Sequence, residues 1–86
     1  MALLRSVAER LRAEGWSVVN VDAVVLAEAP RLSPYIEAMR ERLAGALGIQ
    51  PGQVGIKATT MEGLGPVGRG DGIAAQAVAL LRRAEA

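Results

Sequence analysis

The residues of this sequence with the clearest capacity for chemistry lie in one short segment, Lys57-Ala-Thr-Thr-Met-Glu62. The hydroxyls of Thr59 and Thr60 can donate hydrogen bonds to phosphate oxygens, and the carboxylate of Glu62 can hold a hard divalent cation that bridges such oxygens. Alternatively, the threonines are ordinary strand residues and Glu62 begins a solvated turn. The residue types alone leave these two interpretations open.

A second unusual segment follows directly, with five glycines among residues 63–72. This density predicts a loop whose backbone conformations favour glycine. The spacing Gly63-x-Gly65-x-x-Gly68 resembles a dinucleotide fingerprint, but Pro66 removes an amide that a phosphate would need. Only 18 residues follow Gly68, too few for the remaining helix, strand and ribose-binding acid of that unit.

The composition excludes several classes of function. The 86 residues include no histidine and no cysteine, which removes imidazole bases, His-dependent triads and thiolate metal sites. A net charge of +1 argues against a nucleic-acid partner, and no apolar run is long enough to span a membrane. The absence of cysteine fits a reducing compartment, and we expect a cytoplasmic protein.

The first half of the chain predicts a helix and then a strand. Apolar residues recur at helical spacing over residues 2–13, and Gly15 follows as a helix-ending glycine. Branched residues crowd residues 16–29 and favour a strand, ended by Pro30 and covered on both faces. Asp22 lies within this run as a functional carboxylate or, in the interpretation that its setting favours, a structural one.

The second half predicts another helix and another strand. Ser33 is the expected N-cap of a helix that has Pro34 in its first turn and ends at Gly48. Residues 54–60 alternate as a strand does. Two strands make a poor sheet.

The last segment, residues 73–86, is ambiguous. Its alanine content favours a helix by propensity, whereas alternation from Ile73 to Leu81 permits a third strand. Because only Trp16 and Tyr35 are aromatic, the core must consist of small apolar side chains, which favours association with a partner chain.

Four segments, in order, resemble one known family. They are Gly15-Trp-Ser-Val-Val-Asn-Val-Asp22, Ala27-Glu-Ala-Pro-Arg-Leu32, Val54-Gly-Ile-Lys-Ala-Thr-Thr-Met-Glu62 and Gly68-Arg-Gly-Asp-Gly-Ile-Ala74. Together they closely resemble the C-terminal half of the 2-C-methyl-D-erythritol 2,4-cyclodiphosphate synthases. The resemblance implies an α/β (α+β) two-layer sandwich with a mixed β-sheet and helices on one face. It also implies a homotrimer, a single domain over residues 1–86, and a final segment that is a strand.

The resemblance further implies a phosphorus–oxygen lyase of the non-mevalonate isoprenoid pathway. In this reaction the 2-phosphate of a CDP-linked methylerythritol attacks the inner phosphorus of the diphosphate and expels CMP. Zinc and a second divalent ion, magnesium or manganese, polarise the two phosphates.

The family's site residues can be carried onto matching positions of this sequence. The loop that encloses the cytosine matches Ala27, Glu28, Ala29, Pro30, Arg31, Leu32 and Ser33, and the segment at the CDP phosphates matches Thr59, Thr60, Met61 and Glu62. Within that segment Thr60 corresponds to a catalytic threonine and Glu62 to a ligand of magnesium or manganese. Pro66 and Arg69 match further substrate-binding positions, Arg69 near the diphosphate.

The family's zinc ligands have no counterpart in this chain. The resemblance therefore predicts that the 86 residues carry the CDP-binding half of the enzyme and are inactive alone. An alternative is a truncated, non-catalytic domain that retains trimerisation and nucleotide binding. Arg31 also departs from the usual lysine, Met61 from a common threonine, and Pro66 from a frequent aromatic.

Overall fold

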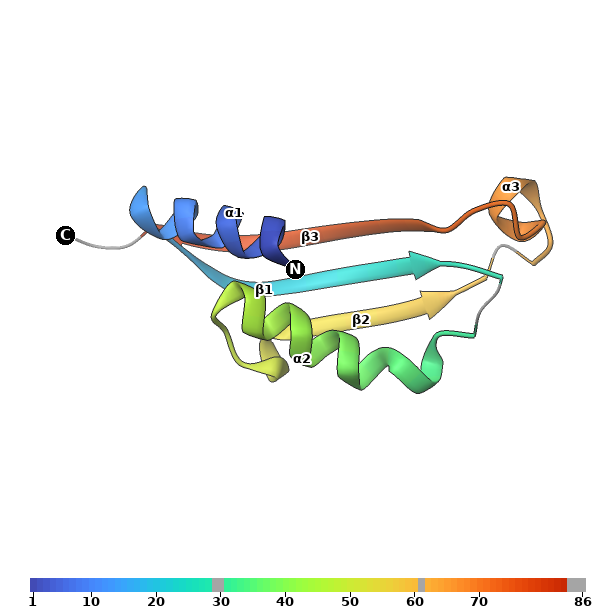
Figure 1. Ribbon diagram of the computed structural model, residues 1–86, viewed down its shortest axis with the longest axis horizontal. Helices are drawn as coiled ribbons and strands as arrows, with labels where there is room; N and C mark the ends of the chain where they lie inside the picture. Colours follow the sequence, from blue (N-terminus) through green and yellow to red (C-terminus); the bar gives the residue numbers. More distant parts are fainter. Residues whose placement is uncertain (29–30, 61, 84–86) are drawn as a thin grey trace.

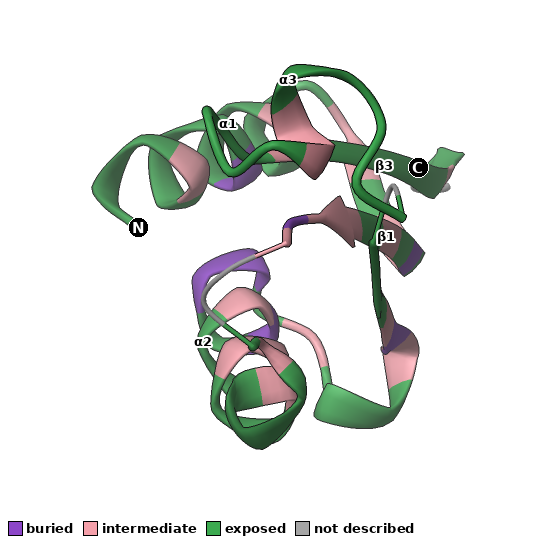
Figure 2. Ribbon diagram, turned by 90° about the vertical axis from the view of Figure 1, so that its right-hand side faces the viewer, coloured by how far each residue is buried: buried purple, intermediate pink, exposed green. Residues whose placement is uncertain are grey.

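The computed structural model describes residues 1–28, 31–60 and 62–83 as one sheet with helices on one face (Figures 1 and 2). The elements in chain order are α1 (Ala2–Ala13), β1 (Trp16–Leu26), the 3-10 turn η1 (Ser33–Tyr35), α2 (Ile36–Leu47), the 3-10 turn η2 (Pro51–Gln53), β2 (Val54–Thr59), α3 (Gly65–Gly68) and β3 (Ala74–Arg83). The strand order is β2-β1-β3, with β1 parallel to β2 and antiparallel to β3. This arrangement confirms the predicted two-layer α/β fold with a mixed sheet.

The final segment is a strand, as the resemblance implied, and its helical propensity is overridden. β3 pairs with β1 along its length, from Trp16 opposite Arg83 to Leu26 opposite Ala74. The Arg83 guanidinium also lies 5.5 Å from the centroid of the Trp16 ring, within the range of a cation–π contact. Alanine prefers a helix by only a fraction of a kcal/mol per residue, about 0.7 at most, so tertiary pairing decides the conformation.

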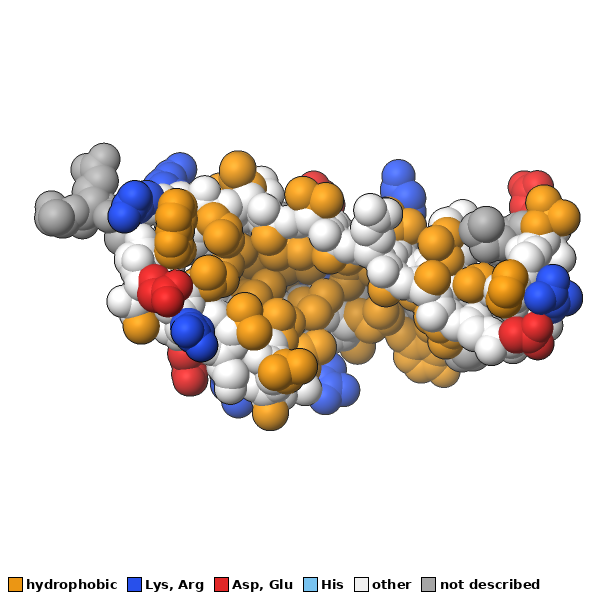
Figure 3. Space-filling view, turned by 90° about the horizontal axis from the view of Figure 1, so that it is seen from above, with side chains coloured by type: hydrophobic (Ala, Val, Ile, Leu, Met, Phe, Trp, Pro, Cys, Tyr) orange, Lys and Arg blue, Asp and Glu red, His pale blue; other side chains and the backbone are white. Residues whose placement is uncertain are grey.

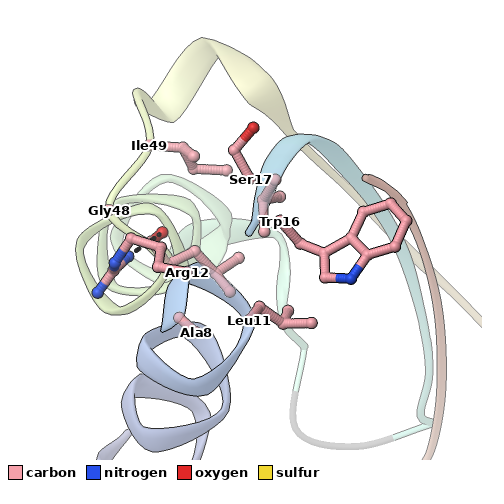
Figure 4. Close-up of a pocket in the computed structure, with 9 residues that line it drawn as sticks. Ala8, Leu11, Arg12, Trp16, Ser17, Gly48 and Ile49 are labelled. Atoms are coloured by element: carbon pink, nitrogen blue, oxygen red, sulfur yellow. Dashed lines mark hydrogen bonds between the residues drawn. The ribbon is translucent and has the colours of Figure 1, made fainter. Parts of the chain in front are cut away.

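Both main helices end at glycines with left-handed backbone, as predicted. Gly15 follows α1 with φ +89°, and Gly48 follows α2 with φ +71°. In Figure 4, Arg12 reaches from α1 to the end of α2, where its Nη1 donates to the Leu47 carbonyl at 3.4 Å. A cation at the carboxyl end of a helix satisfies an orphan carbonyl and opposes the helix dipole.

Two predicted boundaries were wrong. β1 ends at Leu26 rather than at residue 29, because β2 ends at Thr59 and β3 begins at Ala74, the residues that pair with Leu26. Ser33 is not an N-cap: Leu32 precedes η1, and the Ser33 side chain makes no cap hydrogen bond. A 3-10 turn, in which the Tyr35 N–H donates to the Leu32 carbonyl at 2.8 Å, comes before α2 instead.

The buried core lies where α1 and α2 meet the sheet. Ala8, Val21 and Leu47 form its centre, with Leu4, Val18 and Ile49 packed against it as half-buried neighbours. These side chains are small, as expected from the scarcity of aromatic residues. The core is therefore modest, and each large aliphatic side chain in it carries much of the burial.

Leu47→Ala is expected to lower the free energy of unfolding by about 2–4 kcal/mol, because it leaves a cavity at the centre of this core. Urea denaturation of the protein that contains these residues measures the effect. Glu41→Ala, an exposed change on the same helix, is the matched control and should alter stability by less than about 0.5 kcal/mol. Equal effects of the two changes would contradict this placement of the core.

The expectation that the valine-rich strand is covered on both faces is not met by the described residues. α1 and α2 cover the face that bears Val21, whereas Val24, Val78 and Leu80 are exposed on the opposite face. Between the helices an apolar groove of about 500 Å³ opens over the sheet, and Figure 3 shows hydrophobic side chains gathered around this hollow. Among the described residues, neither α1 nor α2 nor α3 is long and apolar enough to cross a membrane.

Candidate nucleotide site

A polar pocket of about 530 Å³ lies at the carboxyl ends of β1 and β2. Parallel strands end at the same edge of a sheet, so the segments that follow them meet there. The residues that line the pocket are Ala27, Glu28, Arg31, Leu32, Ser33, Ala58, Thr59 and Thr60. The structure thus brings together two segments that lie about 30 positions apart and that the family resemblance assigns to cytosine and phosphate binding.

Backbone pairing determines how closely these two segments approach. Leu26 lies opposite Thr59 as the last pair of the β1–β2 ladder. One residue later the Ala27 N–H donates to the Thr59 carbonyl at 3.1 Å, and the Ala27 side chain is buried. The start of the loop after β1 is therefore held against the exit of β2 before either segment turns into the pocket.

The turn after Thr60 has an unusual backbone. Glu62 is the one residue other than glycine with a positive φ in the described part of the chain, at +52°, and Gly63 follows at +78°. The Glu62 N–H donates to Thr60 Oγ1 at 3.2 Å. A hydroxyl that accepts this bond still has its own hydrogen to donate, so Thr60 retains the capacity to bind a phosphate oxygen. The side chain of Glu62 is exposed and, within the described part of the chain, does not line the pocket.

The carboxylate of Glu28 connects the two walls of the pocket, which are the loop after β1 and the segment after β2. Glu28 is half-buried, and its Oε1 accepts a hydrogen bond from the Gly63 N–H at 3.1 Å. This contact spans 35 positions of sequence. It brings the segment that contains Glu62 beside the loop that contains Arg31.

The glycine-rich segment forms one short helical turn, α3, at the far end of the molecule (Figure 1). Gly68 approaches Gly63 so closely that an added Cβ would lie 2.9 Å from the Gly63 Cα. Pro66 is exposed in this turn, and the Nε of Arg69 pairs with the carboxylate of Asp71 at 3.3 Å. Neither Pro66 nor Arg69 lines the pocket within the described residues.

Several other residues singled out in the sequence lie elsewhere. Lys57 and Asp22 line a shallow hollow on the sheet face opposite the helices, and Asp22 Oδ1 lies 2.6 Å from where a Cβ on Gly55 would stand. Asp22 is exposed, although the strand that contains it was expected to be covered on both faces.

Three predicted site residues, Ala29, Pro30 and Met61, lie outside the described residues. Conversely, Ala58 lines the pocket and was not predicted. Its position directly before two candidate threonines was the available signal.

The donor set fits one of the two metal sites implied by the resemblance. Magnesium and manganese sites in phosphate-binding proteins often use one or two carboxylates and take further oxygens from water and substrate. The exposed carboxylate of Glu62 is suitable for this. Zinc does not fit: the sequence has no histidine or cysteine, and the described residues contain no cluster of three or more Asp or Glu side chains.

These elements define a two-layer α/β protein with a polar pocket at the carboxyl edge of two parallel strands. Comparison with protein families gives a match to the YgbB family over residues 1–82. The chain belongs to the YgbB family.

Curated relatives of known name match nearly the whole of this chain. The 2-C-methyl-D-erythritol 2,4-cyclodiphosphate synthase of Pelotomaculum thermopropionicum is 58% identical over 83 residues, which cover 96% of this chain and 51% of that protein. The synthase of Thermosynechococcus vestitus is 60% identical over 80 residues, covering 93% of this chain and 50% of that protein. The chain therefore spans about half the length of the curated relatives it matches.

Solved structures agree with this assignment. The synthase crystal structure from Plasmodium vivax superposes with a TM-score of 0.94 at 39% identity, over 98% of this chain and 56% of that one. The CDP complex of IspF from Plasmodium falciparum gives a TM-score of 0.90 at 27% identity, over 95% of this chain and 53% of that one. The resemblance recognised from four sequence segments is confirmed.

Proposed function

We propose that this chain is the CDP-binding part of a 2-C-methyl-D-erythritol 2,4-cyclodiphosphate synthase, with residues 1–86 forming the C-terminal portion of a single domain. The observation that carries the proposal is the pocket that joins residues 27–28 and 31–33 to Thr59 and Thr60. A CDP group requires one wall that reads a base and another that binds phosphates, and these two segments have the corresponding chemistry. Membership of the YgbB family supports the same conclusion.

In this proposal the loop after β1 encloses the cytosine. Backbone donors and acceptors can read a base edge without charged side chains. Loop residues Ala27 and Leu32 offer apolar contact, and Arg31 is a cation beside the anionic ligand. Pro30 and Ala29 belong to the same proposed loop.

The segment after β2 holds the diphosphate. Thr59 and Thr60 donate hydroxyl hydrogen bonds to phosphate oxygens, and Thr60 is the proposed catalytic residue because its hydroxyl is oriented by the Glu62 N–H. Met61 and Pro66 are proposed substrate contacts. Arg69 would approach the diphosphate once released from Asp71, since one guanidinium can bind either anion.

Glu62 would hold magnesium or manganese at the phosphates. Such an ion, when bound, neutralises charge on phosphate oxygens during departure of CMP. The carboxylate of Glu62 supplies one anionic oxygen for it, and the left-handed backbone at this residue determines where the side chain begins. No step is derived through zinc, because this chain lacks the donors.

We also propose a homotrimeric assembly in the cytoplasm. The exposed apolar side chains of Val24, Val78 and Leu80 support association through the face of the sheet that the helices leave open. No nucleic-acid or membrane partner is proposed, in keeping with the net charge of +1.

The test uses the full-length protein that contains these residues. Incubation with CDP-methylerythritol 2-phosphate and a divalent ion should release CMP, which chromatography detects. Calorimetry should show that the protein binds CDP. Binding of CDP without turnover would favour the alternative of a non-catalytic nucleotide-binding domain. Absence of CDP binding would overturn the proposed function.

A further inference from the structure

A side-chain hydrogen bond between Glu28 and Gly63 joins the loop after β1 to the turn after β2. Gly63 donates its N–H to Glu28 Oε1 at 3.1 Å. Glu28 is half-buried and lines the pocket, whereas Gly63 belongs to the turn that orients Glu62. Together with the bond from the Ala27 N–H to the Thr59 carbonyl, this contact links the segment after β1 to the segment after β2 at two points.

This turn needs such support because its backbone is unfavourable without it. A glutamate with φ +52° followed by a glycine with φ +78° has two successive left-handed residues, and a side chain with a Cβ is disfavoured there. Among the described residues, two hydrogen bonds hold the turn: Glu62 N–H to Thr60 Oγ1, and Gly63 N–H to Glu28 Oε1. The second has an ionised acceptor and is the stronger type.

The charge of Glu28 makes a direct contact with an anionic ligand unfavourable. A carboxylate repels phosphate oxygens, and this one already accepts a backbone N–H. We infer that Glu28 is a positioning residue: it joins the base-binding wall to the phosphate-binding wall and keeps Glu62 in its left-handed conformation. This inference rests on the proposed function, because the two walls are named for the CDP group.

Two substitutions at one position test the inference in the full-length protein. Glu28→Ala removes the acceptor, and Glu28→Gln retains an amide oxygen that can accept the Gly63 N–H. We expect Glu28→Ala to weaken binding of CDP about tenfold, measured by calorimetry. Glu28→Gln should stay within about threefold of wild type. Glu41→Ala, an exposed change on α2, should leave the affinity for CDP unchanged.

Hydrogen exchange adds a readout that does not depend on the ligand. The amide of Gly63 should exchange faster in Glu28→Ala, by about tenfold, and return to near the wild-type rate in Glu28→Gln, while amides in β1 and β2 keep their protection. An unchanged Gly63 amide in Glu28→Ala would overturn the inference, as would equal losses of affinity in both variants.

The failure of the inference is distinguishable from that of the proposed function. Absence of CDP binding by the wild-type protein overturns the proposed function, and with it the assignment of the two walls. Equal CDP affinity in wild type and Glu28→Ala overturns the role of Glu28 alone.

Discussion

Replacing Glu62 with glutamine in the full-length protein is expected to lower kcat on the order of 100-fold, with a much smaller change in KM. The substitution preserves the size of the side chain and the backbone preference at φ +52°, so it isolates the negative charge. In the proposed function Thr59 and Thr60 still bind the diphosphate, so we expect the ground-state complex to survive. In the proposed reaction we expect the loss to fall on the transition state, where charge grows as CMP departs.

A magnesium or manganese titration of wild type and Glu62→Gln, run beside thermal melts, separates two interpretations of this residue. A metal ligand predicts a weaker dependence on the ion and an almost unchanged Tm. A residue that only completes the turn predicts a lower Tm with an unaltered titration curve, and that result would remove the metal-ligand role. Glu41→Gln, an exposed glutamate on α2, controls for the general loss of one negative charge.

Gly68→Ala is expected to weaken CDP binding by at least about tenfold, through the backbone rather than through a lost side chain. An added Cβ would stand 2.9 Å from the Gly63 Cα and closer still to its carbonyl carbon. Because both contacts are with backbone, the loop must move to accept the methyl group. Gly63 is the donor to Glu28, so that movement separates the two walls of the pocket.

The matched control for this change is Gly72→Ala, in the same glycine-rich loop. A Cβ on Gly72 meets nothing within 4 Å, and its φ lies outside the left-handed region. Calorimetry with CDP should therefore give near wild-type affinity for Gly72→Ala. If the two alanine variants bind CDP equally well, the close approach of Gly68 to Gly63 does not support the pocket.

Helix and strand positions were predictable where a local cause existed. The glycines that follow α1 and α2 marked the helix ends because left-handed backbone suits glycine. Branched residues marked β1 and alternation marked β2. The N-cap assignment of Ser33 failed because a 3-10 turn with Pro34 in its first positions was equally compatible with the same residues.

Some residues of the candidate site could also be predicted from the sequence, and others could not. Thr59, Thr60 and Glu62 drew attention by residue type and by their place at a strand exit, and the structure puts the two threonines in the pocket. The partnership of Glu28 and Gly63 had no local signal, since their 35-position separation closes only when β1 and β2 align. Arg69 matches the family pattern, whereas Pro66 departs from it, and neither residue lines this pocket within the described part of the chain.

Residue types and their order were enough to indicate the family, the helix ends and the chemistry of the proposed phosphate-binding segment, because each of these depends on a few neighbouring residues. The conformation of the last segment could be decided only by the sheet. The alanines over residues 73–86 suit a helix or a strand almost equally, and pairing with β1 selects the strand. The valine-rich β1 looked covered on both faces, but burial depends on what packs against a strand, and the described residues place helices on one face only. The pocket likewise exists only because parallel pairing brings the ends of β1 and β2 to one edge of the sheet.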